Sequence, residues 1–271
     1  MDNFVNRKPF VAGQFYEKNP FLLAKQVDKF IVKDTNKVNA TAVISPHAGF
    51  IYSGSVAGAV YSNINIPNTF ILIGPNHTGL GSPLSVFSKG IWETPLHNFE
   101  VDESITSSLL SSCNHFISDV NAHIYEHSIE VQLPFIAFFS KEVKIAPICV
   151  MRASLSQCKE IGEAIARVIK TQKKKIVLVA SSDMSHYVDE ETARDLDNYA
   201  IREILKINPE GLYNVVSQKY ISMCGVLPVI ITLYAALSLG AINSTLIKYT
   251  TSAEVSGDYK HVVGYAGILI N

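Results

Sequence analysis

Two kinds of hydrophobic pattern alternate along the chain. Short, nearly continuous apolar runs predict strands that are buried on both faces of a sheet. Longer segments repeat their apolar residues every three to four positions, as Ile161, Ile165 and Ile169 do, and predict helices with one buried stripe. The predicted strands are Thr41–Ser45, Phe70–Gly74, Leu84–Phe87, Lys144–Val150, Ile176–Ala180, Thr245–Tyr249 and Val262–Ile270.

Turn and capping residues place the predicted helices between these strands. Asn19 before Pro20 is typical of a helix start, and this helix is predicted to run to about Val32. A second helix is predicted to start over Ser53–Tyr61. The other predicted helices cover Asp102–Ser111, Ser128–Phe139, Leu155–Lys170, Glu190–Lys206 and Pro209–Gln218. This alternation predicts an α/β fold, with a central mixed or mostly parallel sheet and helices on both faces. Because no repeat or Pro/Gly/Ser-rich linker divides the chain, we expect a single domain over residues 1–271.

One uncharged segment, Tyr220–Asn243, is long enough to be compared with a membrane span. Pro228 suits the first turn of a helix and Gly240 suits its end, so the helix is predicted to run only from Pro228 to Leu239. A helix of that length is too short to cross a bilayer. We therefore predict a buried core helix in a soluble protein, with no membrane partner.

Composition narrows the classes of function. Hydrophobic residues make up 48% of the 271 residues and charged residues 17%, which is enough apolar material for a large core. The formal net charge of −1 lacks the basic excess that binds phosphate backbones, so no nucleic-acid partner is expected. The four cysteines form no CxxC pair, and no apolar run precedes Arg7 and Lys8. We expect reduced thiols, no signal peptide and a cytoplasmic location.

Candidate chemistry gathers where three of the predicted strands end. His47, His77 and His186 each follow a buried strand, beside small or turn-forming residues. Ligands in open α/β sheets bind beyond the carboxyl ends of the strands, so three neighbouring parallel strands would bring these imidazoles to one cleft. Neutral imidazole is a common ligand for zinc, copper and iron. A single histidine after a strand is more often a hydrogen-bonded loop residue, so the hypothesis depends on the repeated layout.

Cys224 and the segment Glu126–Ser128 are further candidates. Cys224 precedes the predicted apolar helix, where a helix N-terminus would lower the pKa of its thiol and favour a thiolate ligand or nucleophile. The alternative is a small buried apolar residue, which is our interpretation of the other three cysteines. Glu126 or His127 could face the cleft, or Ser128 could simply cap a helix. The histidines interpreted as surface or structural residues are His97, His115, His123 and His261.

A series of short motifs occurs in one order between residues 7 and 267. The most distinctive is Glu126–Phe135 (EHSIEVQLPF). The others are Arg7–Pro9, Ala12–Tyr16, Ser45–Gly54, Gly74–Gly79, Trp92–Leu96, Ser181–His186, Cys224–Gly225 and Val262–Gly267. Together they resemble the Memo family (mediator of cell motility), whose prokaryotic members are called AmmeMemoRadiSam system protein B.

This resemblance implies a fold and a metal site. The fold would be that of the class III extradiol dioxygenases, in which two histidines and a glutamate bind Fe(II). The ligands here would be His47, His77 and Cys224, with Asp183 and His186 lining the same cleft. A thiolate in place of the carboxylate puts ring cleavage in question and favours softer metals. The resemblance therefore implies one transition-metal ion, with iron or copper ahead of zinc.

Two functions of different class follow from these motifs. The first is a metal-dependent redox or oxygenase-like enzyme acting on a small-molecule substrate, with His186 as general acid or base oriented by Asp183. His186 is then expected beside the metal but outside its coordination shell, because three protein ligands leave a position open. The second is a non-enzymatic adaptor that binds phosphotyrosine or other anionic peptides in the same cleft. The resemblance also implies radical-SAM and AMMECR-type partner proteins.

Overall fold

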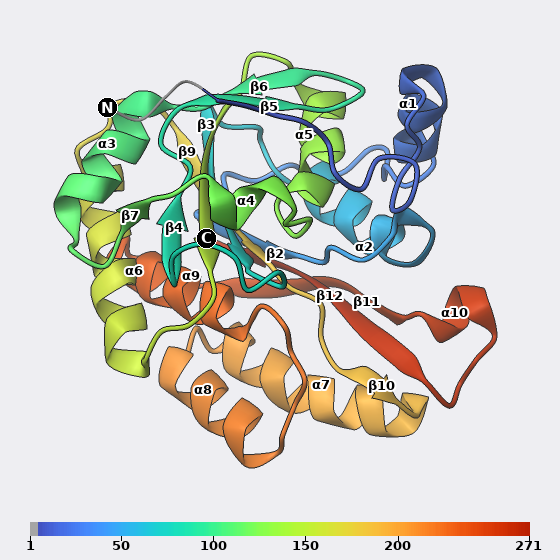
Figure 1. Ribbon diagram of the computed structural model, residues 1–271. Helices are drawn as coiled ribbons and strands as arrows, with labels where there is room; N and C mark the ends of the chain where they lie inside the picture. The colour runs from blue at the N-terminus through green and yellow to red at the C-terminus, as the bar shows by residue number, and fades with distance from the viewer. Residues whose placement is uncertain (1–4) are drawn as a thin grey trace.

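A nine-stranded mixed sheet runs through the middle of the computed structural model, which describes residues 5–271 (Figure 1). Its strands are β2 (Ala42–Ser45), β3 (Thr69–Pro75), β4 (Leu84–Val86), β7 (Ile117–Ser118), β8 (Lys144–Val150), β9 (Ile176–Ser181), β10 (His186–Val188), β11 (Ser244–Thr251) and β12 (Val262–Ile270). They lie in the order β10–β12–β2–β9–β3–β8–β4–β7, and β11 pairs with β12. The neighbours β2, β9, β3 and β8 are parallel, whereas β12 is antiparallel to β2 and β4 to β8.

Helices cover both faces of this sheet, as the alternation of strands and helices predicts. The helices packed on one face are α1 (Pro20–Asp28), α2 (Phe50–Ser62) and α5 (Leu133–Phe139). Those on the other are α3 (Glu103–Ser112), α6 (Leu155–Lys170), α7 (Glu190–Leu205), α8 (Pro209–Gln218) and α9 (Val226–Ser238). Successive strand residues serve different cores: Val43 packs with the first group, and Ala42 and Ile44 pack with the second. Every side chain of β2 is buried, which explains its continuous apolar sequence.

Several predicted elements are confirmed and others differ through tertiary contacts. The bounds of α6, α8 and β8 are those predicted. Helix α1 ends at Asp28 instead of about Val32. Beyond it, Phe30 packs so closely on α2 that a Cβ added at Gly54 or Gly58 would lie within 3 Å of Phe30 atoms. Helix α2 begins at Phe50, before the predicted Ser53.

The predicted helix over Ser128–Phe139 is interrupted. Its first part is a 3₁₀ turn, η1 (Glu130–Gln132), and α5 begins only at Leu133, with Pro134 in its first turn. The Ser128 hydroxyl does not cap a helix; it donates a hydrogen bond to the Pro75 carbonyl of β3, 2.9 Å away. The segment before η1 is therefore tied to the end of a strand, and the prediction of one continuous helix was wrong.

The uncharged segment around α9 forms the buried helix that the sequence predicts. Val229, Ile230 and Ile231 are fully buried in the core on that face of the sheet. Gly240 ends the helix with a positive φ of 89°, where a side chain would be strained. Within residues 5–271, no helix has both the length and the apolar character needed to cross a membrane.

A second, three-stranded sheet was not predicted. It consists of β1 (Val5–Arg7), β5 (Gly90–Glu93) and β6 (Asn98–Glu100), and two short helices, α4 (Asn121–Ile124) and α10 (Ala253–Ser256), complete the chain. The strands of this sheet are too short for a clear periodic pattern. Its packing depends on Trp92, which is fully buried, and on the Arg7 guanidinium, which lies 4.3 Å from the centre of the Trp92 ring.

Arg7 forms a buried ion pair with Glu130, with 2.6 Å between Nη1 and Oε2 and no exposed side-chain surface on either residue. The Glu130 carboxylate also accepts hydrogen bonds from the backbone N–H groups of Phe10 and Val11 and from the Tyr16 hydroxyl. A buried charge is tolerated only when its partners are complete, as they are here. The pair therefore holds residues 7–16 against η1.

We predict that Arg7→Leu lowers the free energy of unfolding by about 3–5 kcal/mol, because it leaves the Glu130 carboxylate buried without its cation. The neighbouring Lys8 provides a matched control. Its exposed ion pair with Glu93 predicts a loss of less than about 1 kcal/mol for Lys8→Ala. Urea unfolding of the two variants measures both values. Equal losses would show that the buried pair has no special role.

Candidate metal centre

The carboxyl ends of three adjacent parallel strands meet at one edge of the sheet. His47 follows β2, His77 follows β3, and Asp183 follows β9, which lies between them. Cys224 reaches the same place from the turn before α9. Gly225 allows this approach, because a Cβ at that position would lie 2.3 Å from the Ser181 carbonyl oxygen.

The ligand atoms of His47, His77 and Cys224 all lie within 4.8 Å of one another. Nε2 of His47 is 3.3 Å from Sγ of Cys224. A tetrahedral ion with bonds of about 2.0–2.3 Å to nitrogen and sulfur separates its ligand atoms by roughly 3.3–3.7 Å, so this spacing suits a transition metal. His47 is buried, whereas 35% of the His77 side-chain surface is exposed, so the site opens to solvent beside His77.

The hydrogen bonds of Ser181 determine which nitrogen of His47 faces this site. The Ser181 hydroxyl donates to the Ser128 carbonyl at 2.6 Å and accepts from the Gln132 side-chain amide at 2.9 Å. Its only proton is thus committed, and Nδ1 of His47, 2.9 Å away, must be the donor. The Nε2 lone pair of His47 is left directed toward Cys224.

Glu126 fixes His77 in the same way. Its carboxylate accepts from the His77 ring Nδ1 at 2.9 Å and from the His77 backbone N–H at 2.5 Å. Burial opposes ionisation of Glu126, but the hydrogen bond and charge of His77 and the charge of His127 outweigh it and lower the pKa of Glu126 to about 2. Because an ionised carboxylate can only accept, Nδ1 of His77 is the donor and Nε2 is available to a metal.

His127 also lies in this cleft, a placement that sequence reasoning left undecided. Its ring stacks on that of His77, with 4.7 Å between centroids, and lies 5.4 Å from the ring of His47. His77, Glu126 and His127 also meet the spacing of a metal-binding group. Glu126, however, already accepts hydrogen bonds from His77 and from the Ser128 backbone N–H. We therefore interpret Glu126 as the support of the two imidazoles.

The prediction of a lowered pKa for the Cys224 thiol was wrong. Burial and then the Asp183 charge raise this pKa. Helix α9 begins only at Val226, and the backbone N–H groups of Asp183 and Gly225 lower this pKa by less than burial and the Asp183 charge raise it. The sulfur accepts a hydrogen bond from the Asp183 backbone N–H at 3.3 Å, an arrangement that also suits a thiolate. A metal must therefore displace the thiol proton when it binds.

Asp183 and His186 share the cleft, but Asp183 does not orient His186 as predicted. The buried Asp183 carboxylate accepts from the His47 backbone N–H at 2.8 Å, and burial raises its pKa to about 6. His186 is held by Ser222 instead. Its backbone N–H donates to the Ser222 hydroxyl and its ring Nδ1 to the Ser222 carbonyl, both at 2.8 Å. Since a carbonyl only accepts, Nδ1 carries the proton and Nε2 of His186 is free to accept one.

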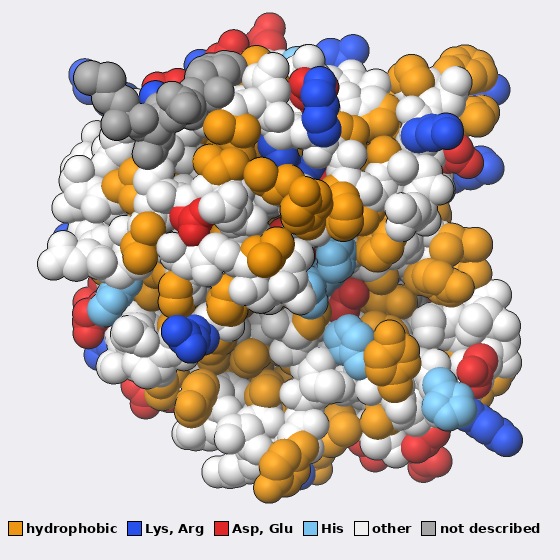
Figure 2. Space-filling model, in the orientation of Figure 1, with side chains coloured by type: hydrophobic (Ala, Val, Ile, Leu, Met, Phe, Trp, Pro, Cys, Tyr) orange, Lys and Arg blue, Asp and Glu red, His pale blue; other side chains and the backbone are white. Residues whose placement is uncertain are grey.

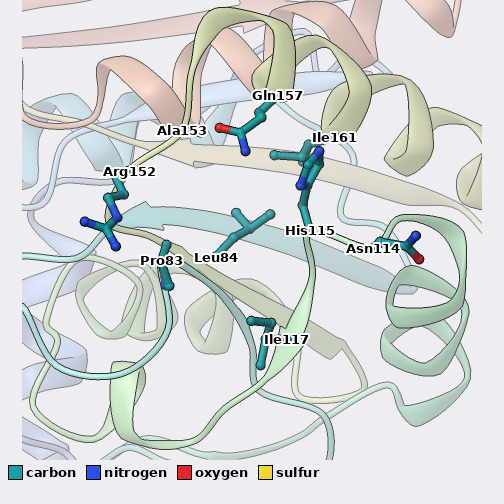
Figure 3. Close-up of a pocket in the computed structure, with 9 residues that line it drawn as sticks. All are labelled: Pro83, Leu84, Asn114, His115, Ile117, Arg152, Ala153, Gln157 and Ile161. Carbon is teal, nitrogen blue, oxygen red and sulfur yellow. The ribbon is translucent and has the colours of Figure 1, made fainter.

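The remaining histidines are structural or lie elsewhere. His123 is fully buried between Phe87 and Trp92. His115 lines a pocket between β4, β7 and the start of α6, and its ring pairs with Glu160 (Figure 3). None of the predicted site residues lines that pocket.

The fold and this edge together define a class of protein. It is a mixed α/β protein with a fold like that of the class III extradiol dioxygenases, and side chains that could hold a metal ion lie beyond its central parallel strands. An uncharacterized protein from Escherichia coli K12 has a similar structure, with a TM-score of 0.56 at 13% sequence identity, covering 84% of this chain and 99% of that one. That likeness concerns the fold alone.

The chain belongs to the Memo family. The family model described as Memo-like protein matches residues 7–269. A MEMO1 family protein of Pyrobaculum aerophilum is 39% identical over 97% of this chain and 98% of its own length. Others from Methanococcus maripaludis and Aquifex aeolicus are 40% and 41% identical and cover 98% and 97% of this chain, and 100% and 98% of their own lengths. The family resemblance inferred from the motifs is confirmed.

If His47, His77 and Cys224 are the ligands, replacing any one with alanine should sharply weaken metal binding. Loss of a residue that only supports a ligand costs about 10–100-fold in affinity, and loss of a ligand should cost more. Circular dichroism should show an intact fold. Cys113→Ser, which changes a half-buried thiol outside this group, should leave the affinity unchanged. Titration with a competing chelator measures the affinities. A similar loss in all four variants would overturn the assignment.

We also predict that Glu126→Gln weakens metal binding by about 10–100-fold. The three groups that bind this carboxylate, Nδ1 and the backbone N–H of His77 and the backbone N–H of Ser128, are all donors. An amide would therefore place its own NH₂ against a donor. Asp102→Asn is the matched control, because Asp102 is a buried carboxylate that binds Thr69 and Lys174 outside the cleft. An unchanged affinity in Glu126→Gln would exclude a supporting role.

Proposed function

We propose that the chain is a metal-dependent redox or oxygenase-like enzyme that acts on a small molecule and holds one transition-metal ion with His47, His77 and Cys224. The observation that carries this proposal is the orientation of the two histidines. Each donates its Nδ1 proton to a buried partner, and each offers a ring nitrogen within 4.8 Å of Sγ of Cys224. Ligands oriented by such partners are typical of metal centres.

Three ligands leave room for a substrate. When bound, iron or copper would supply a redox-active centre with an open coordination position, and the thiolate among the ligands favours these softer metals over calcium or magnesium. The protein's own contribution is to orient the ligands and to place proton-accepting groups around the opening. The Asp183 carboxylate fixes the backbone of His47 and stays outside the ligand group.

His186 is the proposed general acid or base. Ser222 accepts the Nδ1 proton of its ring, so that Nε2 is the nitrogen placed to take a proton from a substrate bound in the cleft and return it later. Its charge acts on both His47 and Asp183, which lie on the wall of the cleft. His127 presents another imidazole on the side of His77. The cleft thus has proton-transfer groups on two sides.

The adaptor hypothesis has less support. Phosphate recognition in proteins typically uses arginine or lysine donors. In the part of the chain that the structure describes, no lysine or arginine forms a hydrogen bond or an ion pair with the four cleft imidazoles, Asp183 or Cys224. Arg7, whose charge acts on His127, is buried and paired with Glu130.

The proposal retains radical-SAM and AMMECR-type proteins as expected partners.

Elemental analysis after anaerobic purification tests the metal, and O₂ consumption with a reductant tests the reaction. We predict that His186→Ala keeps its metal but loses turnover by about 10²–10⁴-fold, the usual contribution of a proton-transfer group. His115→Ala, a histidine outside the cleft, should change neither. Loss of metal from His186→Ala would make His186 a ligand and remove the open position. Full activity would remove its catalytic role.

A further inference from the structure

Backbone strain is located directly beside the cleft. Among residues 5–271, the non-glycine residues with positive φ are Asp34, Tyr187, Ile207 and Tyr220. Side chains with a Cβ rarely adopt this conformation, and a bulky one costs free energy there. Tyr187, with φ of 60°, immediately follows His186. Strain of this kind gathers at functional sites, because the structure around it must enforce it.

The fold explains the backbone of Tyr187 but not its side chain. His186 pairs with Val263 and Val188 pairs with Val262, so the register shifts at Tyr187 as in a β-bulge. Glycine adopts the required φ without strain. Ile207, another strained residue, is only 5% exposed, so packing explains its side chain. Tyr187 is 76% exposed, so burial in the core does not explain why an aromatic residue occupies this position.

The surroundings of Tyr187 indicate what its ring can contact. Its centroid lies 5.9 Å from that of His186, the proposed acid or base. Tyr265 is buried, and Asp183, Tyr52 and Tyr187 lie near enough to raise its pKa beyond the effect of burial. Tyr52, in the first turn of α2 after His47, is 38% exposed. Tyr187 and Tyr52 are therefore solvent-exposed aromatic side chains, and Tyr187 lies next to the proposed catalytic residue His186.

Aromatic side chains border the opposite side as well. Phe15 packs edge-on against His127 at 4.9 Å, and Phe10 packs against the exposed Tyr125 at 5.3 Å. Figure 2 shows histidine side chains at the surface of this face with hydrophobic side chains beside them. An opening bordered by aromatic rings, without cations bound to its imidazoles, suits a ligand with a planar apolar body more than a compact anion.

We infer that Tyr187 is a ligand-contacting residue that determines specificity at the proposed metal centre, where its ring packs against the planar body of a ligand bound at the open position. The inference depends on the proposed function. On this inference, the strained backbone of Tyr187 turns its ring toward the space in front of His186. The inference also separates the two parts of ligand recognition. A bound metal would hold the donor atoms, and Tyr187 would select the remainder of the molecule.

Two hydroxamates with identical donor atoms test this division. Benzohydroxamate and acetohydroxamate both chelate metals through the same two oxygens, and they differ in a phenyl against a methyl group. Binding to the cobalt-loaded protein is followed by its visible absorption. We expect Tyr187→Gly to weaken benzohydroxamate binding by roughly 3–10-fold and to change acetohydroxamate binding by less than about 2-fold. Tyr187→Phe, which retains the ring, should keep the affinity of the unmodified protein for both.

Tyr220→Gly is the matched control. Tyr220 has φ of 54° and is 90% exposed, so the change relieves strain of the same kind and removes a ring that is even more exposed than that of Tyr187. It should alter neither affinity, and thermal unfolding should show that both glycine variants remain folded. An unchanged benzohydroxamate affinity in Tyr187→Gly, with metal bound, overturns the role of Tyr187 and leaves the metal centre standing. Failure of the unmodified protein to take up metal overturns the proposed function and this inference together.

Discussion

The buried ion pair between Arg7 and Glu130 is the interaction on which the rest of the site depends. Both side chains are fully removed from solvent, so each must find all its partners within the protein. Besides Glu130, the Arg7 guanidinium binds the backbone carbonyls of His123 and Glu126. The pair thus ties the N-terminal segment to the loop that carries Glu126, and Glu126 in turn fixes the ring of His77. A structural ion pair is connected to the candidate metal centre through one carboxylate.

The same principle orders the rest of the cleft. Three of the four imidazoles there donate an Nδ1 proton to a group of the protein: His47 to Ser181, His77 to Glu126 and His186 to Ser222. In these three rings Nε2 is the nitrogen left for metal binding or proton transfer. Such preorganisation has no purpose in a surface that only recognises anions. Because phosphate recognition relies on cationic donors, the arrangement favours chemistry over adaptor binding.

Similarity of fold does not imply similarity of site chemistry in this protein. The structural similarity to the E. coli protein covers most of both chains at 13% identity, which shows that the sheet and helices survive extensive change of sequence. Function is decided by the side chains that the fold presents. In this chain a cysteine stands beside two histidines at the carboxyl edge, so the chemistry must be argued from that set of donors.

The sequence by itself determined seven of the nine strands of the main sheet and most of its helices, because their apolar periodicity is local. The short strands β7 and β10 were not predicted. Position after buried strands also singled out His47, His77 and His186, and the family resemblance gave His47, His77 and Cys224 as the expected ligands. The supports were decided only by tertiary structure. His77 meets Glu126 across 49 residues, and His47 meets Ser181 across 134. The thiol pKa of Cys224 and the exposure of Tyr187 depend on neighbours distant in sequence in the same way. Burial and hydrogen bonding are properties of the assembled interior, and no local pattern of residues encodes them.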